Sequence, residues 1–328
     1  MIVMALDHTR DFIHLGAQSF SPEDLARTTP AIFFTRWITH FCAPVFMFTA
    51  GLGAFLWAQR RASTGELSRF LATRGLWLIF LELTVLRVGM FFNFDYSFVM
   101  LLVIWGLGCC MIGLAALVWL PFPILAGLSA ALILFHNLLD GIKAKQLGSA
   151  SWLLLLHQIG TVPIHGHVFL LAYSLIPWVG VMAGGYCFGR VFLLDSARRR
   201  KILIRVGLGL TVAFLLVRGL NVYGDPRPWA HQPSAIFTVI SFLNCAKYPP
   251  SLSFLLMTLG PALTILGLIE HVRLKASNPL LVFGRAPLFY YILHLPLIHL
   301  LAMCLTWLRY GRAGFFFNGS PAMGGPKK

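Results

Sequence analysis

Ionisable side chains interrupt the first apolar segment of the chain at helical spacing. Asp7, Asp11 and His14 stand four and three residues apart, which places them on one face of a helix, with His8 beside that face. Two explanations fit this pattern. One is a polar cap at the end of a helix. The other is a catalytic face, on which a carboxylate orients an imidazole that takes a proton from an incoming nucleophile.

A second pair of polar side chains lies in the next apolar segment. Arg36 and His40 are four residues apart and share a helical face, so they can meet the first helix across a bundle. An arginine–aspartate pair with a purely structural role explains them equally well. We predict that Asp7, Asp11, His14, Arg36 and His40 converge in one pocket.

Several other polar residues lie within or next to apolar segments, and each has either a structural or a functional explanation. Glu82 and Arg87 are five residues apart, a spacing that points them to different neighbours and favours pairing between helices. His294 is as readily a hydrogen-bonded core residue as a catalytic one. The loop after Arg218 either caps the bundle or receives a polar acceptor. The candidate substrate-binding residues are Arg218, Asn221, Lys247 and Tyr248.

Metal binding is weakly indicated. His165 and His167 flank a glycine, and His136 and Asp140 end an earlier apolar segment. Histidines one residue apart can join carboxylates around zinc, but no H-E-x-x-H pattern accompanies them. The six cysteines have no zinc-ligand spacing. We therefore expect no metal.

The amino-acid composition indicates that this protein lies in a membrane. Hydrophobic residues make up 58% and charged residues 11% of 328, and the mean hydropathy is +0.78, which leaves too little polar surface to cover a soluble globule. The protein must therefore be surrounded by lipid. In lipid, a helix forms the hydrogen bonds of its backbone N–H and C=O groups within itself. We predict an all-α polytopic transmembrane bundle of about nine spans. The spans are expected near Met1–His14, Phe33–Trp57, Gly75–Phe94, Ser97–Leu120, Phe122–Asp140, His167–Phe188, Ile202–Leu220, Ser251–Ile269 and Ala286–Trp307.

The net charge of +15 comes largely from short loops between these segments. Basic loops are typical of the cytoplasmic side of membrane proteins, so we expect no nucleic-acid partner. This rule places the loops after the second, sixth and eighth spans inside, and the loops His14–Ala31, Gly141–Gly166 and Asn221–Pro250 outside. We expect one domain over residues 1–312, with an incomplete first span, and a flexible tail over 313–328.

Several stretches together carry a family resemblance. They are Met4–His14 with Thr35–Gly51, Tyr173–Gly189, and Lys247–Gly260 leading to Gly284–His294. The combination resembles the bacterial members of the heparan-α-glucosaminide N-acetyltransferase catalytic-domain-like family, within a broader superfamily of transmembrane acyltransferases. The likeness spans nearly the whole chain. It implies a helical membrane enzyme that takes acetyl from cytosolic acetyl-CoA and delivers it to an amino sugar or similar acceptor across the membrane.

The resemblance also suggests roles for residues. Asp7 stands where the animal enzymes have a polar asparagine, but the loop Leu15–Ala31 lacks their histidine, so His14 or His8 would have to serve. That departure favours direct transfer, with a histidine or aspartate as base. Basic residues near the predicted inner ends are candidates for the CoA phosphates, although membrane topology alone also explains them. They are Arg60, Arg61, Arg74, Arg190 and Arg285.

The resulting hypothesis is an acyltransferase of the bacterial inner membrane that acts on an envelope glycan. The alternative is a transporter or flippase for a polar lipid or sugar, which would place Glu82 and Arg87 in an aqueous path. A third alternative is a structural membrane protein whose charges only pair helices. Membrane lipids and a sugar or glycan acceptor are the expected partners, and a homodimer is left open.

Overall fold

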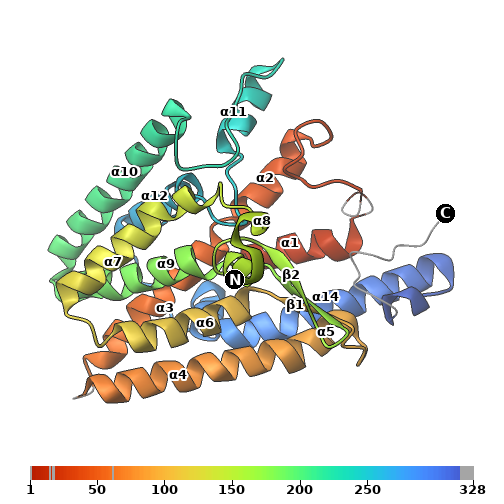
Figure 1. The fold of residues 1–328 in the computed structure, drawn as a ribbon, viewed down its shortest axis with the longest axis horizontal. Coiled ribbons are helices and arrows are strands. Elements are labelled where there is room, and N and C mark those ends of the chain that lie inside the picture. Colours follow the sequence, from red (N-terminus) through yellow and green to blue (C-terminus); the bar gives the residue numbers. More distant parts are fainter. Residues whose placement is uncertain (1, 15, 17–18, 61–62, 318–328) are drawn as a thin grey trace.

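The computed structural model describes residues 2–14, 16, 19–60 and 63–317, and helices dominate it (Figure 1). The helices are α1 (Ile2–Ile13), α2 (Pro30–Thr39), α3 (Cys42–Ala58), α4 (Thr64–Leu81), α5 (Arg87–Phe91), α6 (Val103–Leu117), α7 (Phe122–Phe135), α8 (Ala144–Leu147), α9 (Leu175–Phe188), α10 (Ser196–Leu220), α11 (Ala235–Leu243), α12 (Leu252–Leu268), α13 (Pro279–Arg285) and α14 (Pro287–Tyr310). A π-helical turn, Glu82–Leu86, joins α4 to α5. The predicted all-α fold class is confirmed.

Within the described residues, five helical segments are long and apolar enough to cross a membrane. They are Pro30–Ala58, Phe122–Leu139, Leu175–Leu193, Ser196–Leu220 and Pro287–Tyr310. Val103–Leu117 and Leu252–Leu268 are shorter apolar helices. Each of the nine predicted spans contains a helix, but the number that cross the membrane stays a prediction.

Two predicted spans begin with strands instead of helix. Phe98–Leu101 forms β1 and His167–Leu171 forms β3, and these pair in parallel, with Phe98 opposite Val168. Strand β2, Gly160–Ile164, pairs antiparallel with β3 through a turn at His165 and Gly166, which both have positive φ. Valine and phenylalanine favour strands, so these apolar runs pair as a sheet. The predicted loop Gly141–Gly166 is therefore partly ordered secondary structure.

Glycines allow the central helices to approach closely. A methyl group at Gly51 on α3 would overlap the carbonyl group of Met182 on α9, and one at Gly185 on α9 would overlap that of Phe48 on α3. Small residues at such crossings let helix backbones pack directly, as is common in membrane bundles. The α3–α9 contact thus fixes the middle of the bundle, around which the other helices are arranged.

The two ends of the bundle differ in composition. The end of α3 and the start of α10 lie toward the left of Figure 1, and an ion pair between Arg199 and Glu270 ties α10 to the residues that follow α12. The sheet and α2 lie farther right in Figure 1, and α11 lies at the top. An ion pair between Glu23 and Arg227 joins two of the loops that are predicted to be outside, and which side of a membrane they face remains a prediction.

The first residues of the predicted tail, 314–317, are part of the described structure. Gly314–Phe317 forms a 3-10 turn, Phe316 is buried, and the side chain of Asn93 donates a hydrogen bond to the Phe317 carbonyl. Residues 314–317 thus pack on the bundle, while 318–328 lie outside the described residues.

Candidate active site

A cavity of about 380 Å³ lies where α1, the α2–α3 junction, the sheet and the turn before α12 meet. Its polar and ionisable lining comes from Asp7, His8, Asp11, Arg36, Thr39, Cys42, Tyr173, Lys247, Tyr248 and Tyr291. The apolar lining includes Met4 and Phe12 on α1 and Phe46 on α3. This volume falls at the small end of the roughly 300–1,000 Å³ typical of ligand pockets.

Asp7 is the anchor of this site. Its carboxylate is buried and forms ion pairs with Arg36 on α2 and, at 2.9 Å, with Arg10 one turn later on α1. A buried carboxylate held by two guanidinium groups is stabilised in its charged form and is a poor proton acceptor. Asp7 therefore holds α1 and α2 together and fixes Arg36 at the cavity wall.

His8 and Asp11 are better placed for proton transfer. Both line the cavity, and the Nδ1 atom of His8 lies 4.0 Å from a carboxylate oxygen of Asp11. The His8 ring also packs on that of His294 of α14, with 5.1 Å between the ring centroids. His294 is buried, and its Nδ1 lies 2.7 Å from the Tyr291 carbonyl oxygen. The result is an imidazole at the cavity wall with a carboxylate on one side and a packed ring on the other.

His40 does not line the cavity but contacts Glu23, which in turn faces Arg36 on the cavity wall. His40 is fully buried, and its Nε2 atom lies 3.3 Å from the Glu23 carboxylate, which also faces Arg36 at 3.5 Å and Arg227 at 3.3 Å. Burial raises the pKa of Glu23, but the hydrogen bond with His40 and the charges of the two arginines outweigh this and hold the pKa well below its usual value. Glu23 thus links the α1–α2 loop to α2 and to the loop after α10.

Lys247 supplies a second cation to the cavity. Its side chain is buried, and its ammonium group lies 5.2 Å from the centroid of the Tyr248 ring. Within the described part of the chain this ammonium group has no ion-pair or hydrogen-bond partner. Unlike Arg36, Lys247 keeps its donors free for a ligand.

His14 does not join the cavity. It follows the last residue of α1, is exposed, and faces a separate hollow with Arg10 and Thr35. The prediction that His14 converges with Asp7, Asp11, Arg36 and His40 is therefore wrong for His14. Of the other four, Asp7, Asp11 and Arg36 line the cavity and His40 lies behind it.

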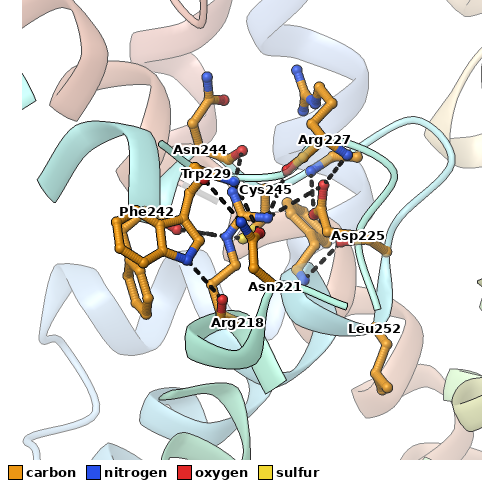
Figure 2. Close-up of polar contacts among 12 residues, drawn as sticks. Arg218, Asn221, Asp225, Arg227, Trp229, Phe242, Asn244, Cys245 and Leu252 are labelled. Atoms are coloured by element: carbon orange, nitrogen blue, oxygen red, sulfur yellow. Dashed lines mark hydrogen bonds and ion pairs between the residues drawn. The ribbon is translucent and has the colours of Figure 1, made fainter. Parts of the chain in front are cut away.

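Arg218 and Asn221 are not among the residues that line the cavity. Figure 2 shows their polar contacts. The buried Arg218 guanidinium donates hydrogen bonds of 2.8–3.2 Å to the carbonyl groups of four residues and lies 3.6 Å from Asp225; the four are Arg227, Ser241, Phe242 and Asn244. Asn221 exchanges side-chain hydrogen bonds with the backbone of Trp229. These contacts hold the loop after α10, and binding of a substrate by Arg218 and Asn221 stays a prediction.

Comparison with known proteins identifies the family. The family model described as "Heparan-alpha-glucosaminide N-acetyltransferase, catalytic" matches residues 2–223, about two thirds of the 328 residues. The chain belongs to this family. Searches of curated proteins and of solved structures gave no match. The membership and the apolar helices together indicate a multi-pass membrane protein of an acetyltransferase family, as the resemblance implied.

The family match covers α1 to α10 and stops before part of the site. Lys247, Tyr248 and Tyr291 line the same cavity as Asp7 but lie beyond residue 223. The C-terminal helices of this family member therefore complete a cavity that the matched segment begins.

The residues predicted to bind CoA lie apart from the cavity. Arg60, Arg74, Arg190 and Arg285 are exposed, and none is among the described residues that line it. The guanidinium of Arg190 lies over the Phe122 ring. Arg61 lies outside the described residues. Contact with a donor nucleotide stays a prediction for all five.

The remaining polar residues of the membrane region make structural contacts. Glu82 accepts a hydrogen bond from the Trp105 backbone in the first turn of α6, and Arg87 bonds Asn93 and the Asp95 carbonyl. Neither residue lines the cavity, and an aqueous path at Glu82 and Arg87, which transport would require, stays a prediction. Their different neighbours match the expectation from their spacing.

The histidines considered for metal binding are dispersed. His157 lies 2.7 Å from Asp140, whose carboxylate also accepts a hydrogen bond from Asn137, whereas His167 contacts the Tyr96 carbonyl. Burial raises the pKa of Asp140, but the hydrogen bonds from His157 and Asn137 lower it below its usual value. The described residues contain no group of three or more His, Cys, Asp or Glu side chains arranged to hold a metal ion.

Proposed function

We propose that this protein transfers an acetyl or other acyl group from acyl-CoA to an amino sugar or other envelope glycan, and that the transfer occurs in the cavity beside His8. The observation that carries the proposal is the meeting of His8, Asp11 and the unpaired Lys247 at one small cavity. The family membership supports acetyl transfer as the reaction class.

The arrangement suits general base catalysis. His8 takes the proton from the acceptor hydroxyl or amine as that group attacks the thioester carbonyl, and Asp11 stabilises the resulting imidazolium. The Lys247 ammonium group balances the negative charge that develops on the carbonyl oxygen. When the C–S bond breaks, the CoA thiolate leaves and accepts the proton held on His8. Asp7 and Arg36 position α1 and α2 around this reaction.

The proposal places the acceptor and the donor at opposite ends of the bundle. The cavity reaches Phe46 on α3, and the distance along the helix from Phe46 to Ala58 at its other end is roughly 18 Å. The acyl arm of a cytosolic donor must cross this distance. The basic residues beyond that end, including Arg60, are the expected phosphate contacts, and a bacterial inner membrane is the expected location.

A vesicle assay tests the proposal. Purified protein is reconstituted into vesicles with radiolabelled acetyl-CoA enclosed and glucosamine outside, and acetylated glucosamine is measured in the external medium. The expected result is product outside that requires both the protein and the donor. Glucosamine uptake without acetylation would instead support the transporter alternative.

A further inference from the structure

A second hollow borders helix α1, on a different face from the cavity. Met4, Asp7, His8, Asp11 and Phe12 face the cavity, whereas Leu6, Thr9, Arg10, Ile13 and His14 face a hollow bounded by α2 and α14. Within α1 the two sets follow the helical period, and His14 comes directly after the end of the helix, so α1 separates the two spaces. The hollow is open and has a volume of about 650 Å³. Figure 1 shows α1 lying between α2 and α14.

The lining of this hollow combines apolar and basic groups. Leu6 and Ile13 on α1 are exposed, at 46% and 39%, and Ile32 of α2 lies beside them. Arg10, His14 and Arg309 bring three basic side chains to the same hollow, and its described lining includes no acidic residue. The apolar side chains can contact the acyl chain of a lipid, and the basic groups can contact its charged headgroup.

The donors of these basic groups are incompletely used. One terminal nitrogen of Arg10 contacts Asp7 and Asp11, but Nε and the other terminal nitrogen are buried and have no hydrogen-bond partner among the described residues. Arg309 is exposed, lies over the Tyr310 ring, and has no ion-pair partner in the described part of the chain. Buried guanidinium groups with free donors are costly without an acceptor, and a phosphate group supplies several.

We infer that this hollow binds an anionic phospholipid of the membrane, with the phosphate at Arg10, His14 and Arg309 and an acyl chain against Leu6, Ile13 and Ile32. The site is distinct from the proposed catalytic cavity and does not depend on the acyltransferase proposal. It does touch the cavity through Arg10, because the same guanidinium also holds Asp7 and Asp11. Lipid occupancy therefore adjusts the charge around both carboxylates.

Native mass spectrometry of the full chain in detergent tests this inference. The protein is mixed with dioleoylphosphatidylglycerol or dioleoylphosphatidylcholine at equal concentrations, and the retained lipid is quantified. We expect stronger retention of phosphatidylglycerol, and about fivefold weaker retention for Arg309→Gln, because a basic residue near anionic headgroups contributes on that order. Arg205→Gln, which removes another exposed arginine on α10, should leave retention unchanged.

A second variant and a competing ligand test whether the hollow binds the whole lipid or only its phosphate. Ala31→Trp fills the hollow without changing its charge and should also reduce lipid retention, since Ala31 lines it and is exposed. Inorganic phosphate at the same concentration should not displace the lipid. Equal retention of the two lipids, no effect of Arg309→Gln and Ala31→Trp, or full displacement by inorganic phosphate would each overturn the lipid assignment.

Discussion

Two arginines, Arg218 and Arg36, each face a carboxylate but have different surroundings. Arg218 faces Asp225 and donates hydrogen bonds to four backbone carbonyl groups. Arg36 faces Asp7 and Glu23 but also borders a cavity that His8 and Lys247 share. Arg218 therefore joins structural elements, whereas Arg36 joins α1 to α2 beside a cavity in which the ammonium group of Lys247 is free to bind a ligand.

The largest effect is expected at His8. His8→Ala removes the proposed base and should lower the rate of acyl transfer by about 10²–10⁴-fold, measured as the initial rate with saturating donor. Thermal unfolding should be nearly unchanged, because the ring is only partly buried. Full turnover in this variant would move the base elsewhere, with His294 the next residue to test.

Arg218 is expected to matter for stability instead. Arg218→Met leaves several carbonyl groups without a donor and removes the cation beside Asp225, and breaking such a buried pair costs about 3–5 kcal/mol of the free energy of unfolding. Denaturant unfolding in detergent measures this loss, with the exposed Arg205→Met as the matched control on α10. A stable Arg218→Met variant with weakened acceptor binding would contradict the structural assignment.

Lys247 tests the functional side of the comparison. Lys247→Met should lower kcat by about 10²-fold, the typical loss when one group that stabilises the oxyanion is removed. Lys247→Arg keeps the charge and should recover part of the rate. If Lys247→Met changed only the unfolding temperature, the free ammonium group would be structural like Arg218.

Glu23 links the two regions, because Arg36 and Arg227 both face its carboxylate. Its pKa is lowered in the folded protein, so its contribution to stability is present above the unfolded value of about 4.3 and is lost as the pH falls toward the folded pKa. Glu23→Gln should cost about 1–3 kcal/mol at pH 7. The difference from the unmodified protein in chemical unfolding should shrink below about pH 4, and a constant difference would contradict this role.

His14 is expected to show the smallest effect. It faces the hollow behind α1, so His14→Ala should change the transfer rate less than about twofold, within the range of surface substitutions. The parallel assay with His8→Ala provides the comparison. A large loss at His14 with none at His8 would exchange the proposed roles of the two faces of α1.

The sequence predicted the helices well because long apolar runs leave few alternatives in lipid. It also placed Asp7 near Arg36, since both interrupt apolar helices. The prediction that His14 lies in the cavity was wrong for a local reason. On an ideal helix His14 would point in the same direction as Asp7, but α1 ends at Ile13. The strands β1 and β3 failed because an apolar run alone does not distinguish helix from a buried strand.

Other features of the site depend on distant contacts that spacing cannot reveal. Glu23 lies in a loop predicted without a role, yet it pairs with His40 and reaches Arg227, 204 residues away. Arg218 looked like a substrate contact because a polar residue at a helix end fits either role. The only signal for Glu23 was its acidic charge in a loop next to a basic helix.

The most direct test of the account uses Cys42, a native free cysteine that lines the cavity, and the exposed Cys304 as internal control. The rate of modification by a small methanethiosulfonate reagent is measured at both thiols by mass spectrometry, with and without saturating acetyl-CoA. The account predicts that acetyl-CoA slows modification of Cys42 at least about tenfold, as expected when a ligand fills most of its pocket, and leaves Cys304 unaffected. Equal rates at Cys42 with and without the donor would contradict the claim that acyl transfer occurs in this cavity.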